Sequence, residues 1–175
     1  GRYLLRACSA PPHVREACSI FSEAPPPMTT EHRGSCLCGN VRFTVRGELP
    51  PVQICHCSQC RQAQGGPLAT NIPVAVAALT FERGEDLLRF YESSPGKERA
   101  FCSVCGSPVF SRRGAIPDTV RLRAGLLQEP VALSLGFHAH MDSRAGWWPV
   151  DDGLPAFPGA APSGVGAPSA PDDRE

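Results

Sequence analysis

The sequence predicts an all-β fold of antiparallel sheets with little helix. Glycine and proline number 17 and 19 among the 175 residues, a combined share well above their average of about 12%, which disfavours long helices. Three short segments alternate apolar and polar residues between glycine or proline residues, as half-buried strands do. Neither a strand–helix–strand order nor an internal repeat is visible, so Rossmann-type and solenoid folds are excluded.

Local signals place the individual elements. The alternating segments, predicted to be strands, are residues 41–45, 87–91 and 119–123. Between the first two, residues 58–64 are compatible with one or two helical turns, which Gly65 and Gly66 then end. Residues 125–128 indicate a turn before Pro130. Because no helical crossovers separate the strands, we expect antiparallel pairing.

Composition divides the chain into one domain and two flanking segments. Residues 1–28 are rich in proline and lack any strand or helix period, so we expect a disordered extension. Met28, followed by two threonines, is typical of a translation start, which would place residues 1–27 upstream of it. In residues 159–175 only Val165 is apolar and larger than alanine, so we expect a disordered tail. Residues 29–158 remain as a single folded domain.

The charge balance limits the partners of the protein. It has 17 basic and 17 acidic residues and a pI near 7.1, which argues against nucleic acid or an anionic membrane as a partner held by bulk charge. A neutral partner or a local site fits better. The most apolar stretch, residues 67–79, is shorter than the roughly 20 residues of a membrane helix. No apolar run typical of a secretion signal follows Arg2, so we expect a cytoplasmic protein.

Cysteine spacing carries the strongest chemical signal. In a strand, the side chains of residues two apart point to the same face. We therefore expect strands to bear the Cys-X-Cys pairs. Cys-X-X-Cys is typical of zinc-binding turns. Gly39 and Gly106 each directly follow the last cysteine of a pair, and glycine there permits a positive φ that turns amide hydrogens toward sulfur. Cys8 and Cys18 lie in the extension. The other seven cysteines form three groups: Cys36 and Cys38; Cys55, Cys57 and Cys60; Cys102 and Cys105.

The sulfurs of these seven cysteines form two candidate zinc-binding sets, one of four and one of three. Cys36, Cys38, Cys102 and Cys105 supply the four that close a structural zinc site. Cys55, Cys57 and Cys60 supply three, which leaves one position of a second zinc open to a thiol substrate. A second closed site completed by His56, His138 or His140 is the alternative, although His56 faces away from a strand-borne pair. Disulfides need an oxidising compartment and a thioredoxin-type pair needs a βαβ unit, and neither condition is met.

The cysteine motifs resemble a known family. Segments 34–39 (GSCLCG), 41–43 (VRF), 55–61 (CHCSQCR) with Gly65 and Gly66, and 101–106 (FCSVCG) occur in the order found in the glutathione-dependent formaldehyde-activating enzymes, which include centromere protein V. His138, Trp148 and residues 154–157 (LPAF) are similar to the C-terminal signature of that family. The resemblance covers about residues 34–157.

The resemblance implies a β-tent fold with two zinc ions, in which the four-cysteine group is structural and Cys55, Cys57 and Cys60 hold the catalytic ion. It implies a carbon–sulfur lyase that joins glutathione and formaldehyde into S-(hydroxymethyl)glutathione, a detoxification reaction. Arg61 is then a candidate ligand for a glutathione carboxylate, or a donor to backbone carbonyls. His138 and His140 are candidates to shuttle a proton, or ordinary packing residues. Trp147 and Trp148 are expected to cover the core.

Two other functions fit the same residues. A zinc-stabilised binding module resembling centromere protein V would act without catalysis, but a chromatin role calls for a basic stretch, whereas Arg112 and Arg113 stand alone and the tail is acidic. A redox sensor would release zinc when its thiolates are oxidised, and nothing in the sequence indicates a partner surface for it. We expect the thiol-dependent enzyme.

Overall fold

A computed structural model describes residues 30–162 and 164–165 of the chain. The predicted extension and most of the predicted tail lie outside these residues. Within them the protein is mostly β-structure with one α-helix, as the sequence predicts. The elements are β1 (Glu31–Ser35), β2 (Arg42–Arg46), β3 (Val52–Cys55), α1 (Ser58–Gln64), β4 (Ala69–Ala75), η2 (Val76–Ala78), β5 (Leu79–Arg83), η3 (Glu85–Leu87), β6 (Leu88–Ser94), β7 (Lys97–Cys102), β8 (Pro108–Arg113), β9 (Ile116–Arg123), η4 (Ala124–Leu126), β10 (Leu135–Ala139) and η5 (Met141–Ser143).

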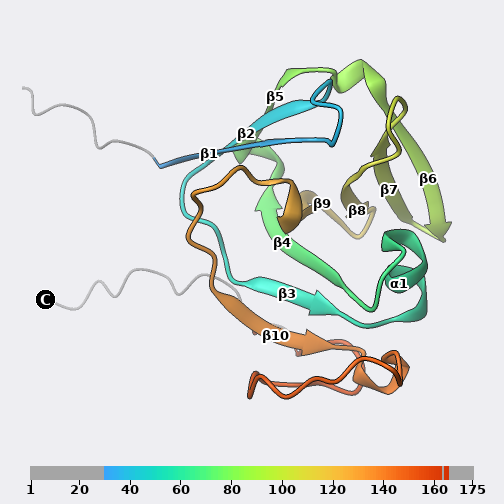
Figure 1. Ribbon diagram of the computed structural model, residues 1–175. Coiled ribbons are helices and arrows are strands. Elements are labelled where there is room, and N and C mark those ends of the chain that lie inside the picture. The colour runs from blue at the N-terminus through green and yellow to red at the C-terminus, as the bar shows by residue number, and fades with distance from the viewer. Residues whose placement is uncertain (1–29, 163, 166–175) are drawn as a thin grey trace, which may run out of the picture.

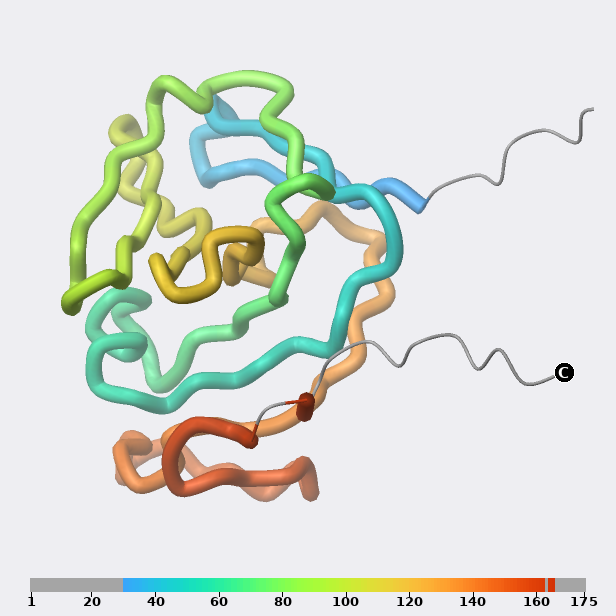
Figure 2. The backbone as a smooth tube through the Cα atoms, turned by 180° about the vertical axis from the view of Figure 1, so that it is seen from behind, coloured from blue at the N-terminus to red at the C-terminus, as the bar shows by residue number. Residues whose placement is uncertain are grey.

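The strands form two sheets. A three-stranded sheet has the order β1-β2-β5, and a seven-stranded sheet has the order β10-β3-β4-β9-β8-β7-β6. The larger sheet curves, so that β3 and β10 lie at one end and β6 and β7 at the other, with α1 close to the latter (Figure 1). Seen from behind, the chain after β10 doubles back along the lower edge of the molecule (Figure 2). Within the described residues no helix is long and apolar enough to cross a membrane.

The three predicted strands and the predicted helix are confirmed. The alternating segments correspond to β2, β6 and β9, and the helix α1 has the predicted bounds. Cys57 caps the N-terminus of α1, because its sulfur accepts a hydrogen bond from the Cys60 amide at 3.4 Å. Gly65 ends the helix with a φ of 63°, a left-handed conformation that glycine adopts without strain.

One pair of strands departs from the predicted antiparallel arrangement. β10 pairs with β3 in parallel, with His138 opposite Ile54 and Ala139 opposite Cys55. Alternating apolar and polar residues indicate which face of a strand is buried, but they do not indicate the direction of its partner. Because β3 and β10 are far apart in the sequence, no hairpin turn forces them to run in opposite directions.

The apolar core lies where the two sheets meet. Phe81 of β5 packs between Phe43 of β2 and Phe110 of β8, with ring centroids 6.3 Å away in each case. In the seven-stranded sheet Ile72 and Leu122 are fully buried on the same side. Because side chains alternate along a strand, Asn71 of β4 and Arg121 and Arg123 of β9 face away from this core.

The two tryptophans do not cover the core, so that prediction is wrong. Trp147 and Trp148 are 69% and 45% exposed and contact each other edge to face, with centroids 6.2 Å apart. They follow η5, beyond the last strand. The buried Phe137 instead packs edge to face against Phe157, with ring centroids 5.7 Å apart.

Candidate metal centres and the adjoining cavity

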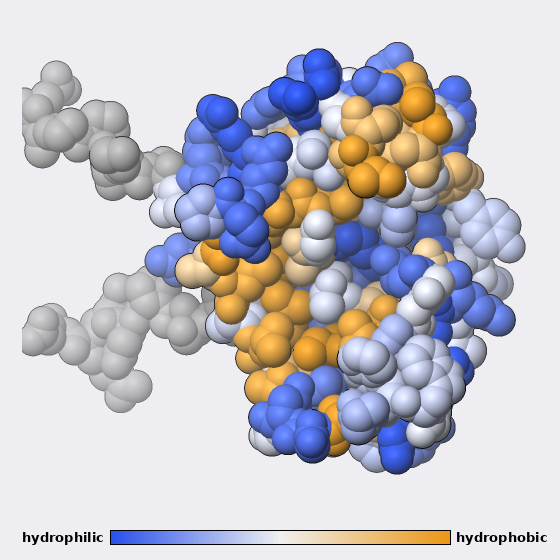
Figure 3. Space-filling view, viewed as in Figure 1, coloured by the Kyte–Doolittle hydropathy of each residue, from blue (hydrophilic) through white to orange (hydrophobic). Residues whose placement is uncertain are grey.

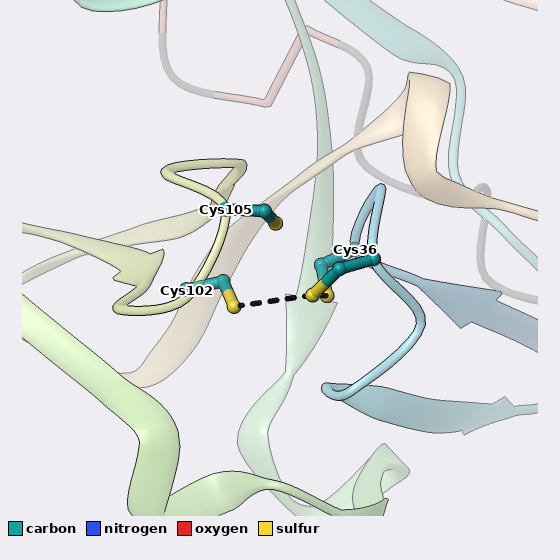
Figure 4. A group of neighbouring side chains, drawn as sticks. Cys36, Cys102 and Cys105 are labelled. Carbon is teal, nitrogen blue, oxygen red and sulfur yellow. Dashed lines mark hydrogen bonds between the residues drawn. The ribbon is translucent and has the colours of Figure 1, made fainter.

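Four cysteines meet between the two sheets. Cys36 and Cys38 follow β1, Cys102 ends β7, and Cys105 lies in the turn that leads to β8. The sulfurs lie within 4.8 Å of one another, with Cys38 Sγ 3.4 Å from Cys36 Sγ and 3.9 Å from Cys102 Sγ. Figure 4 shows the side chains of Cys36 and Cys102 facing each other across the gap between their segments. The cluster therefore joins the two sheets.

Each cysteine pair of this cluster, Cys36 with Cys38 and Cys102 with Cys105, lies in a tight turn. The expectation that strands bear the Cys-X-Cys pairs is wrong, because β1 ends at Ser35, before Cys36 and Cys38, and β3 ends at Cys55, before Cys57. The Gly39 amide donates to the Cys36 carbonyl at 2.9 Å, and the Gly106 amide donates to the Cys102 carbonyl at the same distance. The predicted positive φ is confirmed for both glycines, at 72° and 75°. A turn, rather than the alternation of a strand, brings each sulfur pair together.

The four sulfurs fit a tetrahedral zinc ion. A zinc–sulfur bond of about 2.3 Å places the ligands of a tetrahedron about 3.8 Å apart, close to the two distances above. The Val41 amide donates to Cys36 Sγ at 3.3 Å, which favours the thiolate form that metals bind. Cys36 and Cys102 are buried, so an ion here would be shielded from water on their side.

The other three cysteines meet where β3 passes into α1. Cys55 ends the strand, Cys57 caps the helix and Cys60 lies in its first turn. Their sulfurs also lie within 4.8 Å of one another. Hydrogen bonds from Cys55 and Cys57 hold the pKa of Cys60 far below its ordinary value, whereas those with Cys57 and Cys60 raise the pKa of Cys55. Three thiols this close cannot all ionise without a cation among them.

None of the three histidines considered as a fourth ligand belongs to the three-cysteine cluster, although His140 lines the cavity beside it. His56, between two of the cysteines, is 1% exposed, and its Nε2 lies 2.7 Å from Nδ1 of His138. His138 Nε2 donates to the Asp152 carboxylate at 3.0 Å. That bond needs a proton on Nε2 of His138. In the neutral ring Nδ1 therefore carries no proton, and it accepts a hydrogen bond from Nε2 of His56. His56 therefore faces away from the trio, as predicted. Burial, followed by the neighbouring His138, lowers the pKa of His56.

A cavity of about 630 Å³ opens over the three-cysteine group. Cys55, Cys57 and Cys60 line one part of it, and the chain at 160–162 lines another. Lys97, Arg113 and Arg121 also line it, whereas no acidic side chain of the described residues does. Figure 3 shows hydrophilic side chains gathered near the middle of one face, with apolar ones around them. The cavity is therefore locally cationic in a chain of zero net charge.

Strand register explains this cationic surface. Lys97 lies opposite Arg113, and Arg99 lies opposite Ser111, which in turn lies opposite Arg121. All five therefore share one face of β7, β8 and β9, together with Arg123 two residues beyond Arg121. Gln53, Asn71 and Arg123 are opposed across β3, β4 and β9, so Cys55 shares this face too.

Two arginines lie deeper, behind the cavity wall. Arg99 and Arg123 are only 7% and 4% exposed. Arg99 donates from Nη2 to Cys60 Sγ at 3.9 Å, and Arg123 donates from Nη1 to Asn71 Oδ1. Arg99 Nη1 and Arg123 Nε and Nη2 are buried and find no hydrogen-bond partner among the residues that the structure describes. Burial lowers the pKa of Arg123 to about 10.

Sequence reasoning missed these basic residues. The only signal available was the two-residue spacing of Arg121 and Arg123 in a predicted strand, which puts both on one face. Arg61, the candidate that the sequence did indicate, lies in α1 with a buried Nε, and it is not among the residues that line the cavity. Of the two candidate proton carriers, His140 lines the cavity and His138 is engaged with His56.

The fold and these sites define a small β-protein with two cysteine clusters that could hold metal ions. Residues 31–143 match the profile of the glutathione-dependent formaldehyde-activating enzymes. The chain belongs to this family, as the cysteine motifs indicated.

Individual relatives match over shorter stretches. A Halomonas elongata protein named "Putative glutathione-dependent formaldehyde-activating enzyme" is 40% identical over 85 residues, covering 44% of this chain and 53% of that protein. An uncharacterized lyase of Schizosaccharomyces pombe is 29% identical over 80 residues, covering 46% of this chain and 56% of the lyase. The matched stretches thus span about half the length of these curated relatives. A crystal structure of a Rhodobacter sphaeroides protein is 27% identical, with a TM-score of 0.48, over 57% of this chain and 90% of that one.

The four-cysteine cluster predicts a large effect on stability. We expect Cys102→Ser to unfold or aggregate the protein, since structural zinc contributes about 10 to 16 kcal/mol in small peptides and a domain is stable by only about 5 to 15 kcal/mol. Thermal unfolding and zinc content measure the effect. Ser103→Ala, at the exposed neighbouring position, is the matched control and should change neither. An unchanged melting temperature with full zinc content in Cys102→Ser would contradict the assignment.

The histidine pair predicts a graded effect. Replacing His138 by leucine leaves the buried His56 Nε2 without a partner, so we expect unfolding free energy to fall by about 1 to 3 kcal/mol. Asp152 is half-exposed and accepts the hydrogen bond at the outer end of the series from His56 through His138. Asp152→Asn should therefore lower the unfolding free energy by less than about 1 kcal/mol. Urea denaturation compares the two. Equal losses, or none, would refute the pairing as a buried interaction.

Proposed function

We propose that the protein is a zinc-dependent enzyme of the carbon–sulfur lyase type. It acts on glutathione or another thiol and on formaldehyde or a related aldehyde, and it forms or cleaves an S-hydroxymethyl adduct. One observation carries the proposal: three cysteine sulfurs meet at the wall of a cavity large enough for a small-molecule substrate. Family membership supports the same reaction.

The two clusters have different roles in this proposal. Four sulfurs complete the coordination of a structural zinc ion, whereas Cys55, Cys57 and Cys60 leave one position of a second ion available. Zinc bound there supplies a positive charge that favours the thiolate form of an incoming thiol. Of the histidines that could close this site, His56 and His138 bind each other instead, and His140 lines the cavity without belonging to the three-cysteine cluster.

The protein's own residues prepare the reactants. Arg99, which donates to Cys60 Sγ, balances part of the negative charge that three thiolates bring. In the forward direction the substrate sulfur attacks the aldehyde carbon, a carbon–sulfur bond forms, and the former carbonyl oxygen takes up a proton equal to the one the thiol lost. His140 lines the cavity and is the candidate to carry that proton. The walls hold thiol and aldehyde together, which favours their encounter.

Free thiols are a condition for this chemistry. All seven cysteines of the two clusters are free of disulfides, and thiolate ligands persist in a reducing compartment. We therefore place the enzyme in the cytoplasm, where it would remove formaldehyde as a thiol adduct.

The division of roles predicts the outcome of one substitution. Cys57→Ser should lower zinc content from two ions to one and abolish thiol-dependent formaldehyde consumption, while the fold is kept because the four-cysteine cluster is intact. Metal analysis, circular dichroism and an assay with and without glutathione measure the three effects. The rate of the uncatalysed addition of thiol to formaldehyde is measured without protein and subtracted. Ser103→Ala should retain both ions and full activity.

The outcomes separate the alternatives. A Cys57→Ser variant that keeps full activity would contradict the catalytic role of the trio. Loss of both ions, with unfolding, would show that the trio is structural rather than reactive.

A further inference from the structure

Three cations line the cavity without acidic partners. Lys97 and Arg113 are cross-strand neighbours, and Arg121 lies on the next strand of the same face. Like charges placed side by side in a sheet are destabilising. Burial lowers the pKa of Lys97, and the nearby Arg99 and Arg113 also lower it, whereas Cys60 acts in the opposite direction. Among the described residues that line the cavity, none offers a carboxylate to offset this repulsion.

The arginines behind the cavity add to the unbalanced charge. Arg99 and Arg123 are more than nine-tenths buried and have three unpartnered nitrogen atoms between them. A buried charge without a partner is costly. Three thiolates around a zinc ion would leave one net negative charge, against these two arginines and the three cations of the wall. The site would therefore keep positive charge in excess, which favours an anionic occupant.

The dimensions agree with a substrate that reaches from the cysteines to the wall. A volume of about 630 Å³ lies within the roughly 300 to 1,000 Å³ of small-molecule sites. Arginine presents a planar fork of donors that matches a carboxylate, and lysine adds a point charge. A thiol seated at Cys55, Cys57 and Cys60 can thus direct its carboxylates to the neighbouring strands.

We propose that Lys97, Arg113 and Arg121 form a carboxylate subsite that selects the thiol substrate. This inference rests on the proposed function, and it names the residues that distinguish an anionic thiol from an uncharged one. It places the recognition on β7, β8 and β9, and not on Arg61 of α1. Substrate preference is then set by the sheet face, whereas the reaction is set by the three cysteines.

Binding of a ligand that cannot react tests the subsite. S-methylglutathione keeps both carboxylates of glutathione but has no free thiol, and titration calorimetry on the zinc-loaded protein measures its affinity. We expect Arg113→Gln and Arg121→Gln each to weaken binding by about tenfold or more, as loss of a charge-assisted hydrogen bond does. Arg112→Gln is the matched control: Arg112 precedes Arg113 in β8, faces the other side and pairs with Glu98 at 2.7 Å. It should bind as the wild type does.

A comparison of two thiols needs no variant. Glutathione and its diethyl ester carry the same thiol, but the ester has lost its carboxylate charges. We expect the wild type to favour glutathione in kcat/KM by about tenfold or more, chiefly through KM. Arg121→Gln should remove most of this preference by raising KM for glutathione and leaving the ester unaffected.

Failure of the subsite and failure of the proposed function give different results. Equal efficiency with both thiols, together with unchanged S-methylglutathione binding in the variants, would overturn the subsite and leave the enzyme assignment intact. Loss of S-methylglutathione binding in the variants would support the subsite even if neither thiol promoted formaldehyde consumption. In that case the proposed reaction would be wrong.

Discussion

The constraint on which this structure depends is electrostatic repulsion among closely packed thiolates. Seven sulfurs lie in two groups, each with its members within 4.8 Å of one another, and such groups are stable as thiolates only around a cation. A metal ion held by either group would couple its binding to folding. The two groups differ in how many ligands they offer, because four sulfurs complete the coordination of a tetrahedral ion and three do not.

The two faces of the seven-stranded sheet carry different side chains, and the proposed recognition uses only one of them. On one face Ile72 and Leu122 pack into the apolar core, and on the other Arg121 and Arg123 approach the three-cysteine group. Alternation along β9 allows one strand to do both. The neutral charge of the whole chain hides this arrangement, because acidic residues elsewhere offset the cations of one cavity.

Local features were predictable from the sequence, and partners between distant segments were not. Cysteine spacing indicated the two clusters, and Gly65 fixed the end of α1, because both act within a few residues. The sequence left open that β10 lies parallel to β3, or that Lys97 meets Arg113, since these depend on register between strands. The prediction that Trp147 covers the core was wrong because hydrophobicity alone does not determine where a side chain lies. An exposed tryptophan pair is compatible with a core filled by other aromatic residues.

X-ray absorption at the zinc edge, before and after addition of glutathione, tests whether the three-cysteine zinc has a free coordination position. We expect two zinc ions with an average sulfur number between three and four per ion, rising to four when the thiol binds. An average of four before the thiol is added, or a histidine shell around one ion with no change on addition, would contradict it.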